Sequence, residues 1–200
     1  MMESNGKRES SNLTKKGIFV AAFDNFYQVG FSNASLEKIS KDANVSRGAT
    51  YWHFKNKKDL YEQTVKHILN EIYKKKEVIY QNSALNFKEK AVEIIWLPHE
   101  NKQEFRFLQQ ADVTIALNKE FEELEALISQ ARLDLYDFFK KGIEALQRES
   151  PRLQCFPSKD LANLLYSYFE GMYSSYPPQE ITENYTKDGI RNCLSAIFDK

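Results

Sequence analysis

The sequence predicts an all-α protein. Glycine and proline are scarce, with 7 and 5 residues among 200, and no segment alternates apolar and polar residues for long enough to form a convincing strand. Apolar residues instead recur at intervals of three and four, which is the spacing of one helix face. The chain is 42% hydrophobic and 28% charged, as in an ordinary folded domain. We expect about nine helices, with no internal repeat or low-complexity tract between them.

The chain is expected to begin with a flexible polar tail over residues 1–12, followed by a helix over residues 15–29. The helix carries Phe19 and Phe26 on one apolar face, seven positions apart and hence two turns apart. Gly30 follows, where glycine suits the left-handed backbone that often ends a helix.

Two short helices with a tight turn between them are predicted next, over residues 35–42 and 46–53. Ser35 and Ser46 stand at their starts, where a hydroxyl can cap the free backbone N–H groups. Asn44 falls in the turn, and asparagine tolerates left-handed backbone better than other residues except glycine. This arrangement predicts a helix-turn-helix.

Long helices account for the rest of the chain. One opens after Asn56, with Asp59 in its first turn, where a carboxylate favours the helix dipole. The remaining helices are predicted over residues 87–97, 104–117, 119–149, 158–175 and 182–198. Pro98 is expected to end the first of these, because proline lacks the N–H that a helix interior needs.

The net charge of zero hides an uneven distribution. Residues 1–60 hold ten basic and six acidic residues, so this segment carries +4 and the remainder carries −4. The basic segment contains the predicted helix-turn-helix, which is followed by the aromatic and basic run YWHFKNKK at residues 51–58. Hydroxyl, imidazole and ammonium groups suit phosphate oxygens, so this run favours a nucleic-acid partner. On charge alone the boundary is arbitrary, and chance stays an alternative.

Other classes of site find little support. The polar N-terminus lacks the apolar stretch of a signal peptide, and no apolar run approaches the roughly 18 residues of a membrane span. We therefore expect a cytoplasmic protein with no membrane partner. Cys155 and Cys193 form no CxxC pair and share no metal-ligand spacing with the histidines, so no metal or other cofactor is expected. No nucleophile–base motif or phosphate loop points to an enzyme.

The segment from Ser35 to Leu60, SLEKISKDANVSRGATYWHFKNKKDL, resembles the DNA-binding signature of tetracycline-repressor-like (TetR/AcrR) transcriptional regulators. Residues 26–31 also fit the end of that family's first helix, and the likeness covers residues 15–60. Asn44 stands where the family usually has glycine, which is a conservative change for the backbone geometry of the turn.

The resemblance implies a bacterial or archaeal homodimer with two parts. An N-terminal three-helix domain at residues 13–58 would bind double-stranded operator DNA through its helix-turn-helix. The helices of residues 59–200 would form the effector-binding and dimerisation domain. The function expected is that of a ligand-responsive repressor, which binds a palindromic operator and is released by a small hydrophobic effector. Control of an efflux or a catabolic operon would fit this function.

Carried over position by position, the resemblance assigns the DNA contacts. Arg47, Gly48 and Ala49 fall where family members meet base edges, and an arginine guanidinium can bond guanine O6 and N7 together. Phosphate contacts are expected from Ser35, Ser46, Tyr51, His53 and Lys57. Gly48 could alternatively relieve crowding between helices. Trp52 and Phe54 are expected in the core, because large aromatic side chains are usually buried.

The second half resembles the family in its arrangement of predicted helices more than in its amino-acid sequence. The candidates for an effector pocket are Trp96, Phe105, Phe107, Gln110, Tyr136, Phe139, Tyr166 and Phe169. Each of them fits a helical core equally well. The candidates for a dimer interface on the last two helices are Leu161, Leu164, Leu165, Tyr168, Gly171, Met172, Ile190, Leu194 and Ile197. The same faces could instead close the core of the monomer.

Two further functions stay open beside the ligand-responsive repressor. One keeps the DNA-binding head but has a protein partner, or no small-molecule effector, for the second half. The other is a thiol-based switch through Cys155 or Cys193, and Arg191 lies two positions before Cys193.

Overall fold

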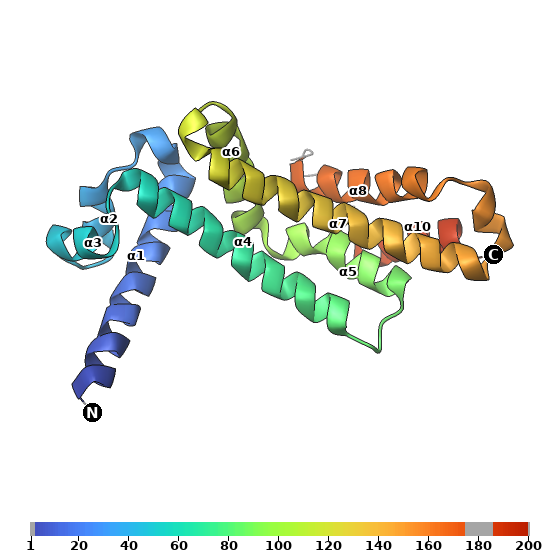
Figure 1. Cartoon of the computed structure of the whole chain (residues 1–200), viewed down its shortest axis with the longest axis horizontal. Helices are drawn as coiled ribbons and strands as arrows, with labels where there is room; N and C mark the ends of the chain where they lie inside the picture. Colours follow the sequence, from blue (N-terminus) through green and yellow to red (C-terminus); the bar gives the residue numbers. More distant parts are fainter. Residues whose placement is uncertain (1–2, 175–185, 200) are drawn as a thin grey trace. The chain divides into compact units, whose positions relative to one another are not determined.

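The computed structural model describes residues 3–174 and 186–199 (Figure 1). In these residues the chain forms nine α-helices, two short 3-10 helices and no strand, which confirms the all-α prediction. The α-helices are α1 (Glu3–Asn33), α2 (Leu36–Asp42), α3 (Arg47–His53), α4 (Lys57–Gln81), α5 (Phe87–Glu100), α6 (Lys102–Ala116), α7 (Glu122–Glu149), α8 (Ser158–Ser174) and α10 (Lys187–Phe198). The 3-10 helices are η1 (Lys119–Phe121) and η2 (Pro151–Cys155).

The chain divides into two compact units. Unit 1 consists of residues 1–70 and 106–124, and unit 2 consists of residues 71–105 and 125–200. Helices α4, α6 and α7 therefore contribute residues to both units. The boundary predicted after residue 58 does not coincide with this division, because a segment from the middle of the chain joins the head.

An aromatic core explains why unit 1 includes that later segment. The buried ring of Tyr61 in α4 meets Phe26 of α1 edge-on, with ring centroids 4.9 Å apart. Phe107 of α6 and Phe121 of η1 are also buried, and their ring centroids lie 6.1 and 5.6 Å from that of Tyr61. Aromatic pairs of this kind contribute more than their buried area alone.

Helix α1 begins at Glu3, so the structure places in a helix most of the segment that was expected to be a flexible tail. Residues 3–12 contain no proline, and their glutamate, lysine and arginine are good helix formers. Gly30 has the positive φ that was predicted for it, 75°, and the chain is kinked there before residue 33. Asn44, at φ 54°, likewise confirms the predicted turn.

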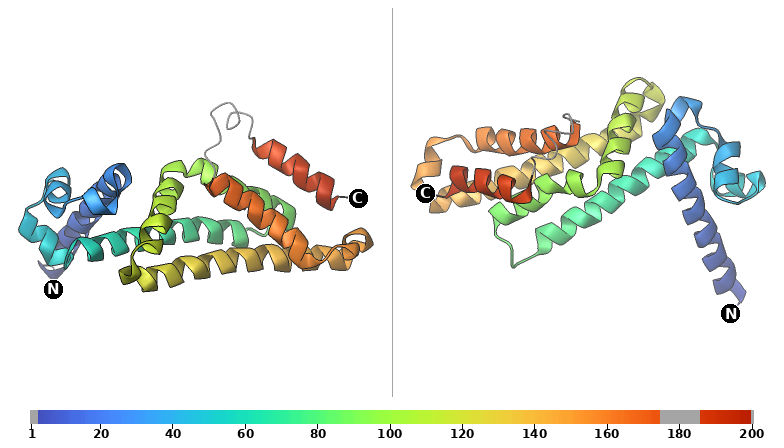
Figure 2. Two further views of the ribbon diagram at one scale, coloured as in Figure 1. Left: turned by 90° about the horizontal axis from the view of Figure 1, so that it is seen from above. Right: turned by 180° about the vertical axis from the view of Figure 1, so that it is seen from behind.

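Unit 2 is a bundle of helices (Figure 2). Helix α5 packs against both α8 and α10, and the views of Figure 2 show α7 alongside α8. Ion pairs line the contact between α5 and α10. They join Lys187 to Glu93 at 2.5 Å and Arg191 to Glu89 at 3.2 Å.

The prediction that α5 ends at Pro98 is wrong, because the helix continues to Glu100. A proline this close to the end of a helix removes a single backbone hydrogen bond, and the ring of Pro98 is buried. Asn101 closes the helix by donating its backbone N–H to Leu97 O at 3.1 Å. The predicted starting segment of the last helix, from residue 182, lies outside the described residues. Within residues 3–174 and 186–199, no helix has both the length and the apolar character that a bilayer crossing requires.

Gly142 in α7 lies where an added side chain would overlap the ring of Phe87. A Cβ built there would lie 2.0 Å from both Cδ2 and Cε2 of Phe87. We expect Gly142→Ala to lower the free energy of unfolding by roughly 1–3 kcal/mol, although alanine is the better helix former. Urea denaturation measures this difference. Gly17→Ala is the matched control, because nothing lies within 4 Å of its added Cβ. An equal loss at both positions would contradict the steric explanation.

Candidate nucleic-acid interface

Helices α2 and α3 form a helix-turn-helix within unit 1. Ser35 Oγ accepts a hydrogen bond from the Lys38 N–H at 3.2 Å, and Ser46 Oγ accepts one from the Ala49 N–H at 3.1 Å. These bonds confirm both predicted N-caps. Each hydroxyl accepts in its cap and keeps its own proton, which leaves both serines able to donate to a phosphate. The positive φ of Asn44 closes the turn between the two helices.

A buried hydrogen bond that the sequence analysis missed also joins the two helices. Ser40 Oγ of α2 lies 2.7 Å from Thr50 Oγ1 of α3. Serine and threonine at these two positions were the signal, since both fall on the inward faces of their helices. The spacing of apolar residues alone does not show which polar side chains share those faces.

The predicted base-reading residues lie at the start of α3. Arg47 and Gly48 are exposed, and Ala49 is half-buried. The Arg47 guanidinium is charged at any physiological pH, and hydrogen bonding to Tyr51 raises its pKa further. A Cβ added at Gly48 would find only Ser46 Oγ within 4 Å, at 3.8 Å. Crowding between helices therefore does not explain this glycine.

The expectation that Trp52 belongs to the core is wrong. Its side chain is 74% exposed, and its one described aromatic contact is a T-shaped pair with His53, with ring centroids 4.6 Å apart. Phe54 is 1% exposed and packs against Phe19 with ring centroids 5.4 Å apart, as predicted. Helix α3 ends at His53 and Phe54 is extended, at φ −138°. The helical spacing of side chains no longer applies across that end, so the two aromatic residues point to different sides.

Tyr51, His53 and Lys57 were predicted to contact phosphates. Tyr51 is 46% exposed, and His53 is half-buried. Lys57 has a second role that the sequence did not reveal. Its Nζ donates to Ser32 O at 3.0 Å and lies 4.8 Å from the centre of the Phe31 ring, which ties the start of α4 to the end of α1.

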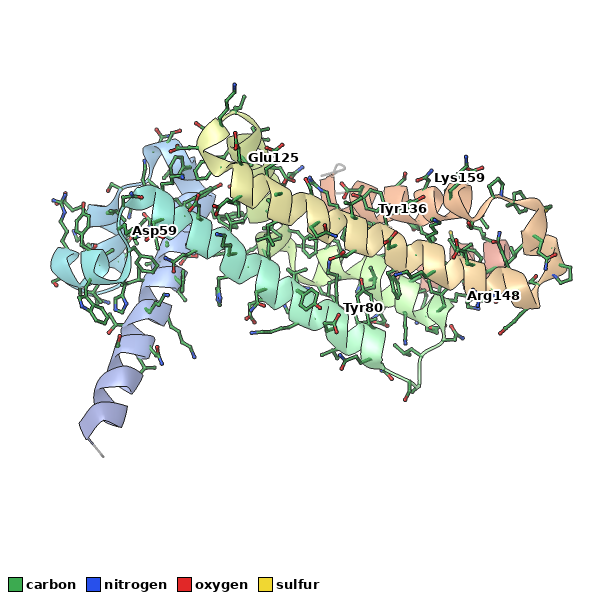
Figure 3. All side chains as sticks on the ribbon, in the orientation of Figure 1. Asp59, Tyr80, Glu125, Tyr136, Arg148 and Lys159 are labelled. Carbon is green, nitrogen blue, oxygen red and sulfur yellow. The ribbon has the colours of Figure 1, made fainter. Side chains whose placement is uncertain are left out.

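Asp59 holds the connection between α3 and α4 in place (Figure 3). Its carboxylate accepts hydrogen bonds from the Lys55 N–H and from Gln63 Nε2, both at 2.8 Å. Burial raises the pKa of Asp59, but these two hydrogen bonds and the nearby charges of Lys55 and Lys15 together outweigh it and leave that pKa below its usual range. Asn56 Oδ1 accepts from the Asp59 N–H at 2.9 Å, which confirms the predicted start of the long helix.

His53 makes the stability of the fold depend on pH. Burial, and then the nearby charge of Lys15, lower the pKa of His53 below 6.5. The unfolded chain therefore binds more protons than the folded protein as the pH falls below about 6.5. The contribution of His53 to stability is present above that pH and is lost as the pH falls toward the folded-state pKa.

We expect the unfolding free energy of the unmodified protein to fall relative to His53→Gln as the pH is lowered from 7 to about 5.5. Urea denaturation across this range measures the difference. His99→Gln is the matched comparison over the same pH range, because burial also lowers the pKa of His99. A constant difference between His53→Gln and the unmodified protein would contradict the expectation.

The predicted effector residues are divided between the two units. Gln110 is exposed and Phe107 belongs to the aromatic core of unit 1. In unit 2, Phe139 is buried, and buried Phe105 and Phe169 pack edge-on at 6.1 Å. The remaining three are half-buried: Trp96 stacks on His99 at 3.9 Å, and Tyr136 (Figure 3) meets Tyr166 at 6.2 Å. A shared effector pocket stays a prediction.

The predicted dimer residues fall into two groups. Leu161, Leu165, Ile190 and Leu194 are buried within the single chain. They already close the core of unit 2, which is the alternative that the sequence left open for them. At least partly exposed are Leu164, Tyr168, Gly171, Met172 and Ile197. Of the predicted residues, this second group remains able to meet another copy directly.

Comparisons with known proteins agree with this geometry. Residues 18–64 match the family described as bacterial regulatory proteins, tetR family. Over 56 residues the chain is 43% identical to the HTH-type transcriptional regulator AcrR of Shigella flexneri, a match that covers 28% of this chain and only 26% of that relative. Over 149 residues it is 27% identical to the uncharacterized HTH-type transcriptional regulator YhgD of Bacillus subtilis (strain 168), covering 71% of this chain and 76% of that relative.

The whole fold also has relatives among solved structures. NalD of Pseudomonas aeruginosa, described as the secondary repressor of the MexAB-OprM multidrug efflux pump, superposes with a TM-score of 0.60 at 17% identity. The superposition covers 94% of this chain and 95% of that one. Within the described ranges, no group of three or more histidine, cysteine, aspartate or glutamate side chains is arranged to hold a metal ion.

Proposed function

The chain belongs to the TetR/AcrR family of transcriptional regulators, and we propose that it is a ligand-responsive repressor that binds a palindromic operator as a homodimer. The observation that carries the proposal is the open space above Gly48 in α3. Glycine costs a helix up to about 1 kcal/mol relative to alanine, and the nearest protein atom would be 3.8 Å from its Cβ. We infer that this space serves a partner outside the chain, the edge of a base pair.

The residues around Gly48 would make two kinds of DNA contact, to base edges and to phosphates. The Arg47 guanidinium would read guanine through O6 and N7, which gives sequence preference. Tyr51 and Trp52 are exposed on the same short helix, and each carries one donor that suits a phosphate oxygen. The hydroxyls of Ser35 and Ser46 would add two further phosphate contacts. In a dimer, the two copies of α3 would lie about 34–36 Å apart, to enter successive major grooves.

Release by a small hydrophobic effector requires that the effector bind the DNA-free state better than the DNA-bound state. Helix α4 contributes residues to both units. It is therefore the element through which we propose that binding in unit 2 changes the position of α3. NalD, a repressor of an efflux pump by its description, supports efflux control as the first circuit to test.

The experiment that tests the function is selection of bound duplexes from random DNA with the full chain. We expect a palindromic sequence, bound with an affinity that falls steeply as salt rises. Equal affinity for the selected duplex and its scrambled version at moderate salt would contradict the proposal. Compounds that raise the melting temperature and release the selected duplex would support the effector. If none does so, a protein partner for unit 2 becomes the better explanation.

Arg47→Ala and Lys57→Ala distinguish a contact with base edges from a contact with phosphates. We expect it to weaken binding to the selected duplex by about 1–3 kcal/mol and to relax preference at one base position. Lys57→Ala should weaken binding to all sequences alike. This variant also loses the bond to Ser32 O, so urea denaturation is needed to measure any accompanying loss of stability. Competition binding with single-base variants of the duplex distinguishes the two results. Identical behaviour of both variants would contradict the division.

A further inference from the structure

The two buried hydroxyls that join α2 to α3 form a hydrogen-bond chain with a fixed direction. Ser40 is 2% exposed and Thr50 is fully buried. Ser40 Oγ donates to Leu36 O at 2.7 Å, and it lies 2.7 Å from Thr50 Oγ1. A serine hydroxyl has a single proton. Because that proton is directed at Leu36, Thr50 is the donor in the bond to Ser40.

Through this hydrogen bond, Thr50 ties α3 to α2. The helix has seven residues, and Thr50 is the one among them that is buried. The other six, Arg47 and Tyr51 among them, are exposed or half-buried. Any rotation of so short a helix about its axis would move Arg47 and break the bond from Thr50.

An apolar pair at these positions would fill the space without burying polar groups. The hydrogen bond therefore adds little to net stability, since folding exchanges bonds to water for bonds within the protein. It adds direction, because an O–H···O bond weakens steeply when its angle changes, whereas apolar contacts tolerate sliding.

We propose that the Ser40–Thr50 hydrogen bond is the positioning contact that sets the angle at which α3 presents Arg47 to DNA. Discrimination between DNA sequences then depends on two residues that touch no DNA. This inference rests on the proposed function and adds to it the structural basis of specificity in this chain.

Three variants of the full chain test the proposal: Ser40→Ala, Thr50→Val and the double variant. Ser40→Ala should lower the urea midpoint most, because it leaves the buried Thr50 hydroxyl without its acceptor. Thr50→Val should lower it less, because Ser40 still donates to Leu36 O. The double variant should regain a midpoint close to that of the unmodified protein, since no buried hydroxyl is left unpaired.

In the double variant, discrimination between the selected and scrambled duplexes should stay reduced although stability recovers. We expect the ratio of affinities for the selected and scrambled duplexes to stay roughly three- to tenfold lower in the double variant. Thr50→Ser, which keeps the hydroxyl, should keep the ratio. Recovery of both the midpoint and the ratio in the double variant would overturn the proposal, because the bond would then only satisfy buried groups.

Amide hydrogen exchange of residues 47–53 in the DNA-free full chain gives a second readout. Although the two proteins should have similar urea midpoints, exchange should be faster in the double variant than in the unmodified protein. Equal exchange would overturn the positioning role. If the unmodified protein fails to discriminate between duplexes, the proposed DNA-binding function fails. The exchange result still decides whether Ser40 and Thr50 hold α3.

Discussion

Phe54→Ala should lower the free energy of unfolding by about 3–5 kcal/mol, whereas Trp52→Ala should change it by less than about 0.5 kcal/mol. The two residues stand two positions apart in the same aromatic run, yet Phe54 is 1% exposed and Trp52 is 74% exposed. Removing the Phe54 ring leaves a cavity beside Phe19, and removing the Trp52 ring leaves only solvent. Urea denaturation of both variants measures the contrast.

We expect Trp52 to contribute to DNA binding although it contributes little to stability. Trp52→Ala should weaken binding of the selected duplex while the fold stays intact. Trp52→Phe is the matched control, because it keeps a ring and removes the indole N–H. Comparable losses of stability in Phe54→Ala and Trp52→Ala would contradict the orientation of these side chains. Unchanged DNA affinity in Trp52→Ala would contradict the contact that we propose for it.

Gly48→Ala should stabilise the free protein and weaken its binding to DNA. The added methyl group has only Ser46 Oγ within 4 Å, and alanine raises helix stability by up to about 1 kcal/mol over glycine. If a base-pair edge occupies that space, the methyl group should lower affinity for the selected duplex by about tenfold or more, as overpacking of a close contact does. Thermal unfolding and DNA titration measure the two effects.

Gly17→Ala again serves as the control, because it adds the same methyl group to a helix in open space. It should leave DNA affinity unchanged. A Gly48→Ala variant with undiminished affinity would show that the glycine is not needed for close approach to DNA. A Gly48→Ala variant that is less stable than the unmodified protein would contradict the open space around this position.

Local features of the fold were predictable from the sequence because they depend on neighbours along the chain. The caps formed by Ser35 and Ser46 need only a hydroxyl placed before a helix. The positive φ at Asn44 needs only a residue that tolerates it. The all-α class follows in the same way from the spacing of apolar residues. Two local expectations were wrong: residues 3–12 are helical, and α5 continues past Pro98, because a proline near a helix end can be accommodated within the last turn.

The candidate site was predictable only in part. The sequence located Arg47, Gly48 and Ala49 at the start of a short helix, and the helix is there. It misplaced Trp52, because the helix ends one residue later and helical spacing cannot be extended across that end. It also assigned Lys57 to DNA alone, although the partners of its Nζ, Ser32 and Phe31, come from the end of α1.

By itself, then, the sequence determined the all-α class, the turn at Asn44 and the family that the head resembles. Tertiary structure alone decided which faces are covered. It placed Phe107 and Phe121 in the core of unit 1 and closed Leu161 and Leu165 within unit 2. It also joined the hydroxyls of Ser40 and Thr50. The physical reason is that helical periodicity says which residues share a face, whereas burial depends on what a distant segment brings against that face.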